Sequence, residues 1–190
     1  MSIESEFDIQ QLQNIGRIVR MALEEMRQAV EPGVTTLALN DVGEKVLSDH
    51  GAESSPPKVY GFPKAICISV NDEIVHGIPT ERKILAGDLV KLDLVAEKSG
   101  YHADAAITVA VPPVSDQNAK LTACAENAFE EARKVAKAGA RIRDLGRTIE
   151  KEVKRQGFGV IRELCGHGIG MTIHEAPDIP IYYNPCNRDR

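Results

Sequence analysis

Two short strands that carry carboxylates constrain this sequence more than any other feature. The segment Asp88–Val111, DLVKLDLVAEKSGYHADAAITVAV, predicts two apolar strands joined by a polar turn. Asp93 and Asp104 stand where a strand favours an apolar residue. If residues 97–100 form a four-residue loop, Asp93 lies directly opposite Asp104, and like charges in that arrangement destabilise a hairpin. The pair therefore predicts a cation held between the two strands.

The alternative for Asp93 and Asp104 is a surface hairpin with two solvated carboxylates. The residues around them disfavour it because they are apolar: Leu92, Leu94, Val95, Ala105, Ala106 and Ile107. Hard divalent cations take carboxylate oxygens as ligands, and the ions of two-metal centres lie roughly 3.5–4 Å apart. We therefore expect the pair to bind metal, since two facing carboxylates can bridge two ions.

Three histidines in segments rich in glycine or proline are further candidates. His167 lies between glycines in GHGIG, which would let the backbone approach a ligand closely. His174 follows in IHEAP and His76 stands in VHGIP, and each could contact a substrate or carry a proton. For these two, ordinary loop histidines are the alternative. Cys67 is expected in a core or pocket, whereas the surroundings of Cys165 fit neither a thiolate nucleophile nor a zinc site well.

The composition excludes several classes of protein. A net charge of −5 without a block of Lys or Arg argues against a nucleic-acid partner. No apolar run approaches the length of a membrane span, and the acidic N-terminal segment MSIESEFDIQQ is unlike a signal peptide. The four cysteines lack CxxC spacing, which indicates a reduced, cytoplasmic protein with free thiols.

Apolar periodicity and turn residues predict an α+β chain. Helices are expected over about 7–30, 37–50, 116–138 and 143–156. Strands are expected over 65–70, 158–164 and the two arms of the Asp93 hairpin, with further extended structure at residues 74–75. Residues 54–57, which contain two prolines, are expected to form a loop.

An internal similarity suggests two related halves. Gly33–Gly51 aligns without gaps on Gly139–Gly157 with five identities in nineteen positions, and each segment follows a long amphipathic helix. Two unrelated helical hairpins could also produce this score. The repeated order of elements favours halves of about residues 7–113 and 114–190 within a single domain, 1–190. Only 33 residues follow Gly157, so the second half would lack a closing hairpin.

Three segments in order resemble type I methionine aminopeptidases: FPKAICISVNDEIVHGIP, LVKLDLVAEKSGYHADAAITV and GHGIGMTIHEAP. The resemblance extends from the first helix to about Pro177. It implies the pita-bread (creatinase/aminopeptidase-like) fold with two pseudo-symmetric halves, the second incomplete. It also implies a metal-dependent aminopeptidase that removes the N-terminal methionine of peptides or nascent proteins by attack of a metal-activated water.

The resemblance further implies roles for individual residues. Asp93, Asp104 and His167 would be metal ligands, and His76 and His174 would act in catalysis at the scissile peptide bond. The residues implied to contact the substrate are His76, His174, Tyr60, Phe62 and Cys67. The implied cofactors are divalent ions (Co, Mn, Fe or Zn), two in the family, with one or none as alternatives for this chain. The implied partner is a peptide N-terminus, without nucleic acid or membrane.

The sequence also departs from the family pattern. Members continue into two further segments that each supply a Glu ligand, and this sequence reaches Arg190 without either. The alternative expectation is therefore a shortened, weakly active or inactive homologue that binds a peptide or a protein partner. An open sheet edge in place of the missing hairpin would favour a homodimer. Val59 and Ile173 stand where relatives often have aromatic residues, so a changed selectivity is the alternative to methionine selectivity.

Overall fold

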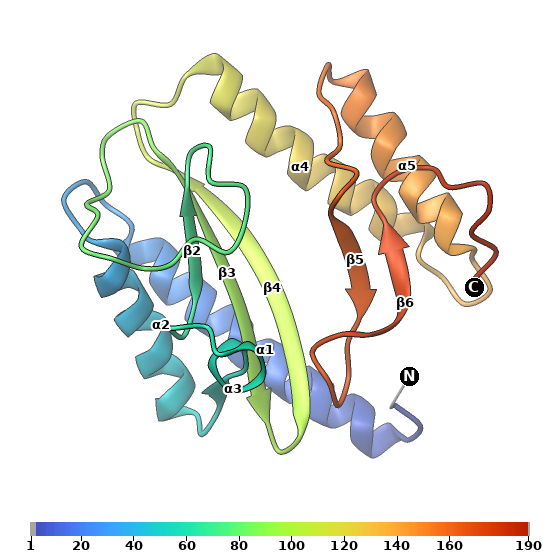
Figure 1. Cartoon of the computed structure of the whole chain (residues 1–190), viewed down its shortest axis with the longest axis horizontal. Helices are drawn as coiled ribbons and strands as arrows, with labels where there is room; N and C mark the ends of the chain where they lie inside the picture. Colours follow the sequence, from blue (N-terminus) through green and yellow to red (C-terminus); the bar gives the residue numbers. More distant parts are fainter. Residues whose placement is uncertain (1–2, 190) are drawn as a thin grey trace. The chain divides into compact units, whose positions relative to one another are not determined.

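The helices and strands of the chain fall into two units, which a computed structural model describes over residues 3–189 (Figure 1). The first unit extends to Ser115 and also includes Ile169–Ile173. The second comprises Asp116–Gly168 and the residues from His174 onward. No helix among the described residues has the length and apolar character needed to cross a membrane.

The first unit begins with a pair of helices, α1 (Glu6–Ala29) and α2 (Thr36–Asp49). A capping box starts α1, because the Asp8 amide donates to Ser5 Oγ while the Ser5 amide donates to the Asp8 carboxylate. Thr35 caps α2 by accepting the Ala38 amide. Both helices lie against one face of a four-stranded sheet (Figure 1). The apolar stripe of each helix and the inward side chains of the sheet form the core of this unit.

The sheet is antiparallel and β3 (Leu89–Lys98) is its central strand. One edge of β3 pairs with β1 (Glu53–Ser54) and β2 (Cys67–Val70), and the other pairs with β4 (Tyr101–Ala110). Alternate β3 side chains are fully buried against the helices: Val90, Leu92, Leu94 and Ala96. Burying one Leu or Val stabilises the fold by about 1.5–3 kcal/mol, so this alternation fixes the register and turns Asp93 to the opposite face.

The second unit contains helices α4 (Asp116–Val135) and α5 (Ile142–Arg155) and the antiparallel pair β5 (Cys165–Gly168) and β6 (Glu175–Pro180). The buried Glu150 carboxylate of α5 accepts the Tyr183 amide at 2.9 Å and pairs with Arg162 at 2.9 Å. The Tyr183 contact fastens the chain that follows β6 to α5, and the Arg162 contact fastens the segment before β5 to the same helix.

The internal similarity between the halves corresponds to structure. Helices α2 and α5 have 14 residues each and begin and end at equivalent positions of the gap-free alignment. The matched glycines Gly33 and Gly139, and Gly51 and Gly157, all have positive φ angles. Each of these two matched pairs of glycines therefore marks a turn that other residues adopt only with strain.

The four expected helices are present within a few residues of their predicted bounds, but three smaller predictions are wrong. Residues 158–164 form turn and irregular structure, and the strand lies at β5, where paired glycines allow β6 to approach closely. Residues 54–57 are no simple loop, because they include the end of β1 and the start of the short helix α3 (Pro56–Tyr60). Ile74 and Val75 are exposed and belong to no strand.

Candidate metal centre and substrate pocket

The turn between β3 and β4 contains two residues, not four. Ser99 and Gly100 both adopt left-handed conformations, with φ of 57° and 84°, so Lys98 pairs directly with Tyr101. Asp93 consequently pairs with Ala106, and Asp104 pairs with Val95. The prediction that Asp93 lies directly opposite Asp104 is wrong, because that prediction assumed a longer loop.

The shift in register changes the distance between the carboxylates but not the face they share. Side chains alternate with a period of two, and the observed register differs from the expected one by two residues, so Asp93 and Asp104 are diagonal neighbours on one face. Diagonal Cβ atoms are separated by roughly 7–8 Å or somewhat less. The repulsion between the two charges is thus weaker than in direct pairing, and both carboxylates face the same side of the sheet.

Cys67 on β2 belongs to the same face, because it pairs with Asp93 across the strands. Burial raises the pKa of the Cys67 thiol to about 12, and the charges of Asp93 and Asp104 contribute to the same shift. Because both carboxylates affect the pKa of Cys67, the three side chains are neighbours on this face. The thiol is protonated at neutral pH, so Cys67 is a neutral group on this face and not a nucleophile.

His76 lies in a strained segment whose backbone is hydrogen-bonded to β2. It is exposed and has a φ of 57°, a conformation that is uncommon for residues other than glycine. Its neighbour Gly77 accepts the Ile68 amide at 2.9 Å and donates its own amide to Ser69 Oγ at 3.0 Å. A Cβ at Gly77 would lie 2.3 Å from the Ile68 oxygen, so only glycine fits here. Ser69, a buried residue that sequence analysis missed, thus helps to position His76.

The two aromatic candidates flank the end of α3. Tyr60 is the last residue of α3 and is 59% exposed, whereas Phe62 is half-buried. Gly61 between them ends the helix in a left-handed conformation, with φ of 67°. The Phe62 amide donates to the Pro56 oxygen at 3.3 Å, which folds the chain back over the helix. Tyr60 and Phe62 belong to the same unit as Asp93 and Cys67.

His167 and His174 lie together in the second unit. Their ring centroids are 4.0 Å apart, with the planes inclined by 52°. His167 Nδ1 lies 2.9 Å from the Gly168 oxygen, and because a carbonyl only accepts, the neutral ring carries its proton on Nδ1. The lone pair is then on Nε2, the nitrogen that a metal ion would bind.

The glycines around His167 serve the packing of β5 on β6. A Cβ at Gly168 would lie 2.7 Å from the Ala176 oxygen and 2.8 Å from the Glu175 oxygen.

Burial, with a contribution from Asp178, raises the pKa of the neighbouring Cys165 thiol, which disfavours a thiolate there.

The predicted site residues therefore form two groups. Asp93, Asp104 and Cys67 share one face in the first unit, and His167 and His174 are in contact in the second. Among residues 3–189, no three His, Cys, Asp or Glu side chains form a cluster arranged to hold a metal ion. The donor types nevertheless suit a divalent cation, since carboxylate oxygens and a neutral imidazole nitrogen bind such ions. The individual roles of these residues stay predictions.

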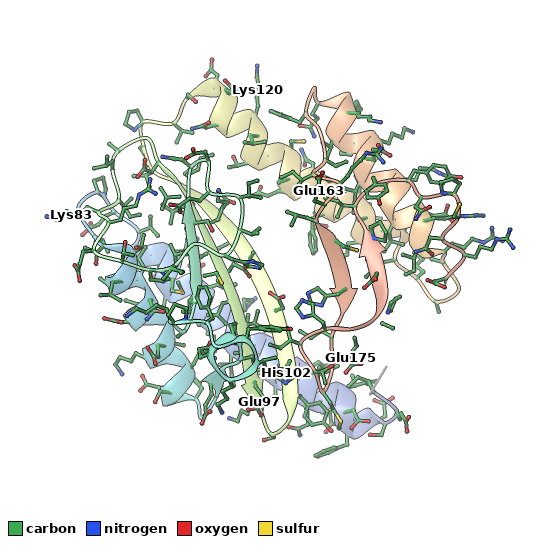
Figure 2. The ribbon with its side chains drawn as sticks, viewed as in Figure 1. Lys83, Glu97, His102, Lys120, Glu163 and Glu175 are labelled. Carbon is green, nitrogen blue, oxygen red and sulfur yellow. The ribbon has the colours of Figure 1, made fainter. Side chains whose placement is uncertain are left out.

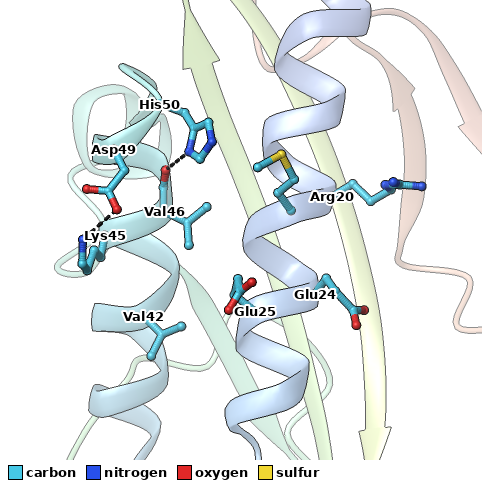
Figure 3. A pocket seen from close by; sticks show the side chains of 9 residues that line it. Arg20, Glu24, Glu25, Val42, Lys45, Val46, Asp49 and His50 are labelled. Atoms are coloured by element: carbon cyan, nitrogen blue, oxygen red, sulfur yellow. Dashed lines mark hydrogen bonds and ion pairs between the residues drawn. The ribbon is translucent and has the colours of Figure 1, made fainter.

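A separate open groove lies on the helical side of the first unit. It has a volume of about 750 Å³ and runs between α1 and α2, with Met21, Val42 and Val46 among charged side chains (Figure 3). None of the predicted site residues lines it.

Comparisons with known proteins agree with the motifs. Residues 10–189 match the model of metallopeptidase family M24. The chain is 47% identical to methionine aminopeptidase 2 of Bacillus subtilis (strain 168), over 97% of the chain and 75% of that protein. It is 39% identical to a methionine aminopeptidase of Staphylococcus epidermidis, over 99% of the chain and 76% of that protein.

Solved structures agree as well. The methionine aminopeptidase of Thermotoga maritima superposes with a TM-score of 0.94 at 32% identity and covers 98% of this chain and 75% of its own. The prolidase of Pyrococcus furiosus, with a TM-score of 0.84 at 22% identity over 95% of this chain and 52% of its own, shares the fold. The pita-bread fold expected from sequence is confirmed, and the binding-protein alternative is not favoured by relatives named as enzymes. The chain belongs to metallopeptidase family M24 and, within it, to the methionine aminopeptidases.

Proposed function

We propose that this chain removes the N-terminal methionine from peptides or nascent proteins by metal-dependent hydrolysis. The observation that carries the proposal is the 47% identity, over 97% of the chain, to a protein named methionine aminopeptidase 2. The shared face of Asp93, Asp104 and Cys67 supports it, because it offers carboxylates for a cation beside a neutral, partly apolar wall. The two units would be the halves of one pita-bread domain spanning residues 1–190.

The proposed metal ligands are Asp93, Asp104 and His167. The family implies a divalent metal cofactor, and Mn, Fe, Co and Zn all accept a mixed set of carboxylate and imidazole ligands. When bound, the metal supplies an activated water and polarises the peptide carbonyl. The hydrogen bond that His167 Nδ1 donates to the Gly168 oxygen holds the ring in the tautomer that a metal ligand requires.

The remaining candidates would bind and orient the substrate. His76 and His174 would donate hydrogen bonds to the scissile region and stabilise the charge that develops there. Tyr60, Phe62 and Cys67 would line the pocket for the methionine side chain, where a thiol with a pKa of about 12 stays neutral. All four cysteines are free, and two are exposed, which supports a cytoplasmic location. A homodimer remains without support from the comparisons.

The test is release of methionine from the peptide Met-Ala-Ser by the purified 190-residue chain. The protein is first treated with a chelator and then supplied with Mn, Fe, Co or Zn separately. We expect turnover with at least one of these ions. Asp104→Asn should lower kcat/KM by about 10²-fold or more, because a ligand charge worth several kcal/mol is lost. Asp116→Asn, at the start of α4, is the matched control and should leave kcat/KM unchanged.

Two results would contradict parts of this proposal separately. Absence of turnover with every ion would contradict the aminopeptidase activity. Equal, metal-dependent turnover by the wild type and Asp104→Asn would leave the activity in place and refute the ligand assignment. Comparison of Met-Ala-Ser with Leu-Ala-Ser tests whether the pocket selects methionine.

A further inference from the structure

His102 stands where three segments of the first unit meet. It lies on β4, two residues before Asp104, and pairs with Glu97 across the hairpin. Figure 2 shows His102 and Glu97 near the turn end of the hairpin. The His102 amide donates to the Gly170 oxygen at 2.8 Å, and its ring Nδ1 is hydrogen-bonded to Ser55 Oγ at 2.9 Å. One residue thus holds the start of α3 and the segment Ile169–Ile173 against β4.

Ser55 is a fixed partner for this ring. It is 1% exposed, and its amide donates to the Val95 oxygen of β3 at 3.1 Å. Its own oxygen accepts the amides of Lys58 and Val59, both at 3.1 Å, so Ser55 is built into the first turn of α3. The backbone of Ser55 therefore ties α3 to β3, while its hydroxyl ties α3 to β4 through His102.

The position of this bond connects it to the predicted site. Residues two apart on a strand point to the same face, so the His102 and Asp104 side chains share the face that carries Asp93. Helix α3 leads directly into the aromatic residues proposed to contact substrate. The segment held by the His102 amide lies, in the sequence, between His167 and His174. No sequence motif assigned a role to Ser55.

We propose that Ser55 and His102 form a positioning pair for the aminopeptidase site. Their hydrogen bond fixes the position of α3 relative to β4. It thereby fixes the position of Asp104 relative to Tyr60 and Phe62, the residues at the end of α3 that are proposed to contact substrate. The His102 amide holds the segment Ile169–Ile173 at the same point. The pair does not touch the reacting atoms, and its effect passes through the residues it orients. This inference rests on the proposed aminopeptidase function.

The first test combines a double-mutant cycle with a rescue. Ser55→Ala removes the hydroxyl, and His102→Phe removes the ring nitrogen but keeps the backbone amide. Each should lower kcat/KM by about ten- to a hundredfold, the range found when residues that orient metal ligands are replaced. Because both remove one shared bond, the double variant should be no worse than either single variant. Ser55→Thr retains the hydroxyl and should restore most of the activity.

The matched control is His50→Phe. His50 is exposed at the end of α2, and its Nδ1 lies 2.9 Å from the Val46 oxygen, so it too is a histidine bonded through Nδ1. Its replacement should leave kcat/KM unchanged.

The second test does not depend on activity. In Ser55→Ala, amide hydrogen exchange should become faster at His102 and in α3, whereas exchange in β2 should match the wild type. Ser55→Thr should return the exchange at His102 to the wild-type rate. A pair that only stabilised the fold would instead raise exchange across the unit and lower Tm in proportion.

The outcomes separate this inference from the proposed function. If the wild type is active and the Ser55→Ala and His102→Phe variants have the same kcat/KM, the proposed positioning role is wrong. A uniform rise in exchange, with a loss of activity that only follows Tm, would overturn it as well. If the wild type is inactive with every metal, the proposed function fails and exchange still decides: faster exchange confined to His102 and α3 supports the pair, and unchanged exchange refutes it.

Discussion

Gly146→Ala should destabilise the second unit, although alanine normally stabilises a helix interior. Gly146 lies within α5, where a Cβ would be 2.3 Å from the Tyr182 oxygen and 2.5 Å from the Pro180 oxygen. Real Cβ atoms do not approach so closely, and both obstacles are backbone atoms that no rotamer change can move. The chain at the end of β6 must therefore shift away from α5.

The expected cost follows from two opposing contributions. Alanine gains up to about 1 kcal/mol over glycine in helix propensity. Forcing an extra methyl group into a packed contact costs about 1–3 kcal/mol, and the shift also strains the bond from the Tyr183 amide to the buried Glu150 carboxylate. We expect a net loss of about 1–2 kcal/mol, which lowers Tm by about 2–8 °C for a chain of this length.

The matched control is Gly16→Ala in α1, where the added methyl group has no atom within 4 Å apart from its chain neighbours and the backbone of its own helix. This change should stabilise the protein by about 0.5–1 kcal/mol. Far-UV circular dichroism through a thermal and a urea transition measures both variants, and near-UV signals report on the tyrosines beside α5. A Gly146→Ala protein as stable as the wild type would refute the tight docking of this segment on α5.

Two further substitutions test single hydrogen bonds in the first unit. Ser69→Ala removes the acceptor of the Gly77 amide and should lower kcat by about tenfold or more, because it frees the strained segment at His76. The lost hydrogen bond, worth about 0.5–1.5 kcal/mol, should lower Tm by about 1–6 °C. An unchanged kcat would exclude that role. Tyr101→Phe removes the 2.6 Å bond to Asp8, which is the main cause that lowers the pKa of Asp8 below its usual 3.8. A lowered carboxyl pKa stabilises the fold above pH 3.8 and ceases to do so as the pH falls through the folded-state value. The wild type should therefore have a higher free energy of unfolding than Tyr101→Phe at pH 7. Urea titrations should show this difference shrinking below about pH 4. A difference that stays constant to low pH would contradict its origin in the lowered pKa of Asp8.

The Asp93 hairpin shows both the reach and the limit of inference from sequence. Apolar alternation located both strands and showed that Asp93 and Asp104 face one side. The turn was misjudged because Ser99 adopts a left-handed conformation that is typical of Asn, Asp or Gly. An error of two residues leaves the face of every side chain unchanged, whereas an error of one would have moved Asp104 into the core. The predicted placement of Asp93 and Asp104 on one face is therefore correct although the predicted register is wrong.

The residues that sequence analysis missed share a different property. Asp93 and Asp104 attract notice because a carboxylate is out of place in an apolar strand, so the local pattern alone reveals them. Ser55 and Ser69 are unremarkable in their local patterns, and their proposed roles depend on the groups they bind. Ser55 binds His102, which is far along the chain, and Ser69 binds the Gly77 amide across a loop. Such contacts depend on strand register, which turn geometry sets and composition does not encode. Candidate metal ligands can therefore be found from sequence more readily than the residues proposed to hold them in place.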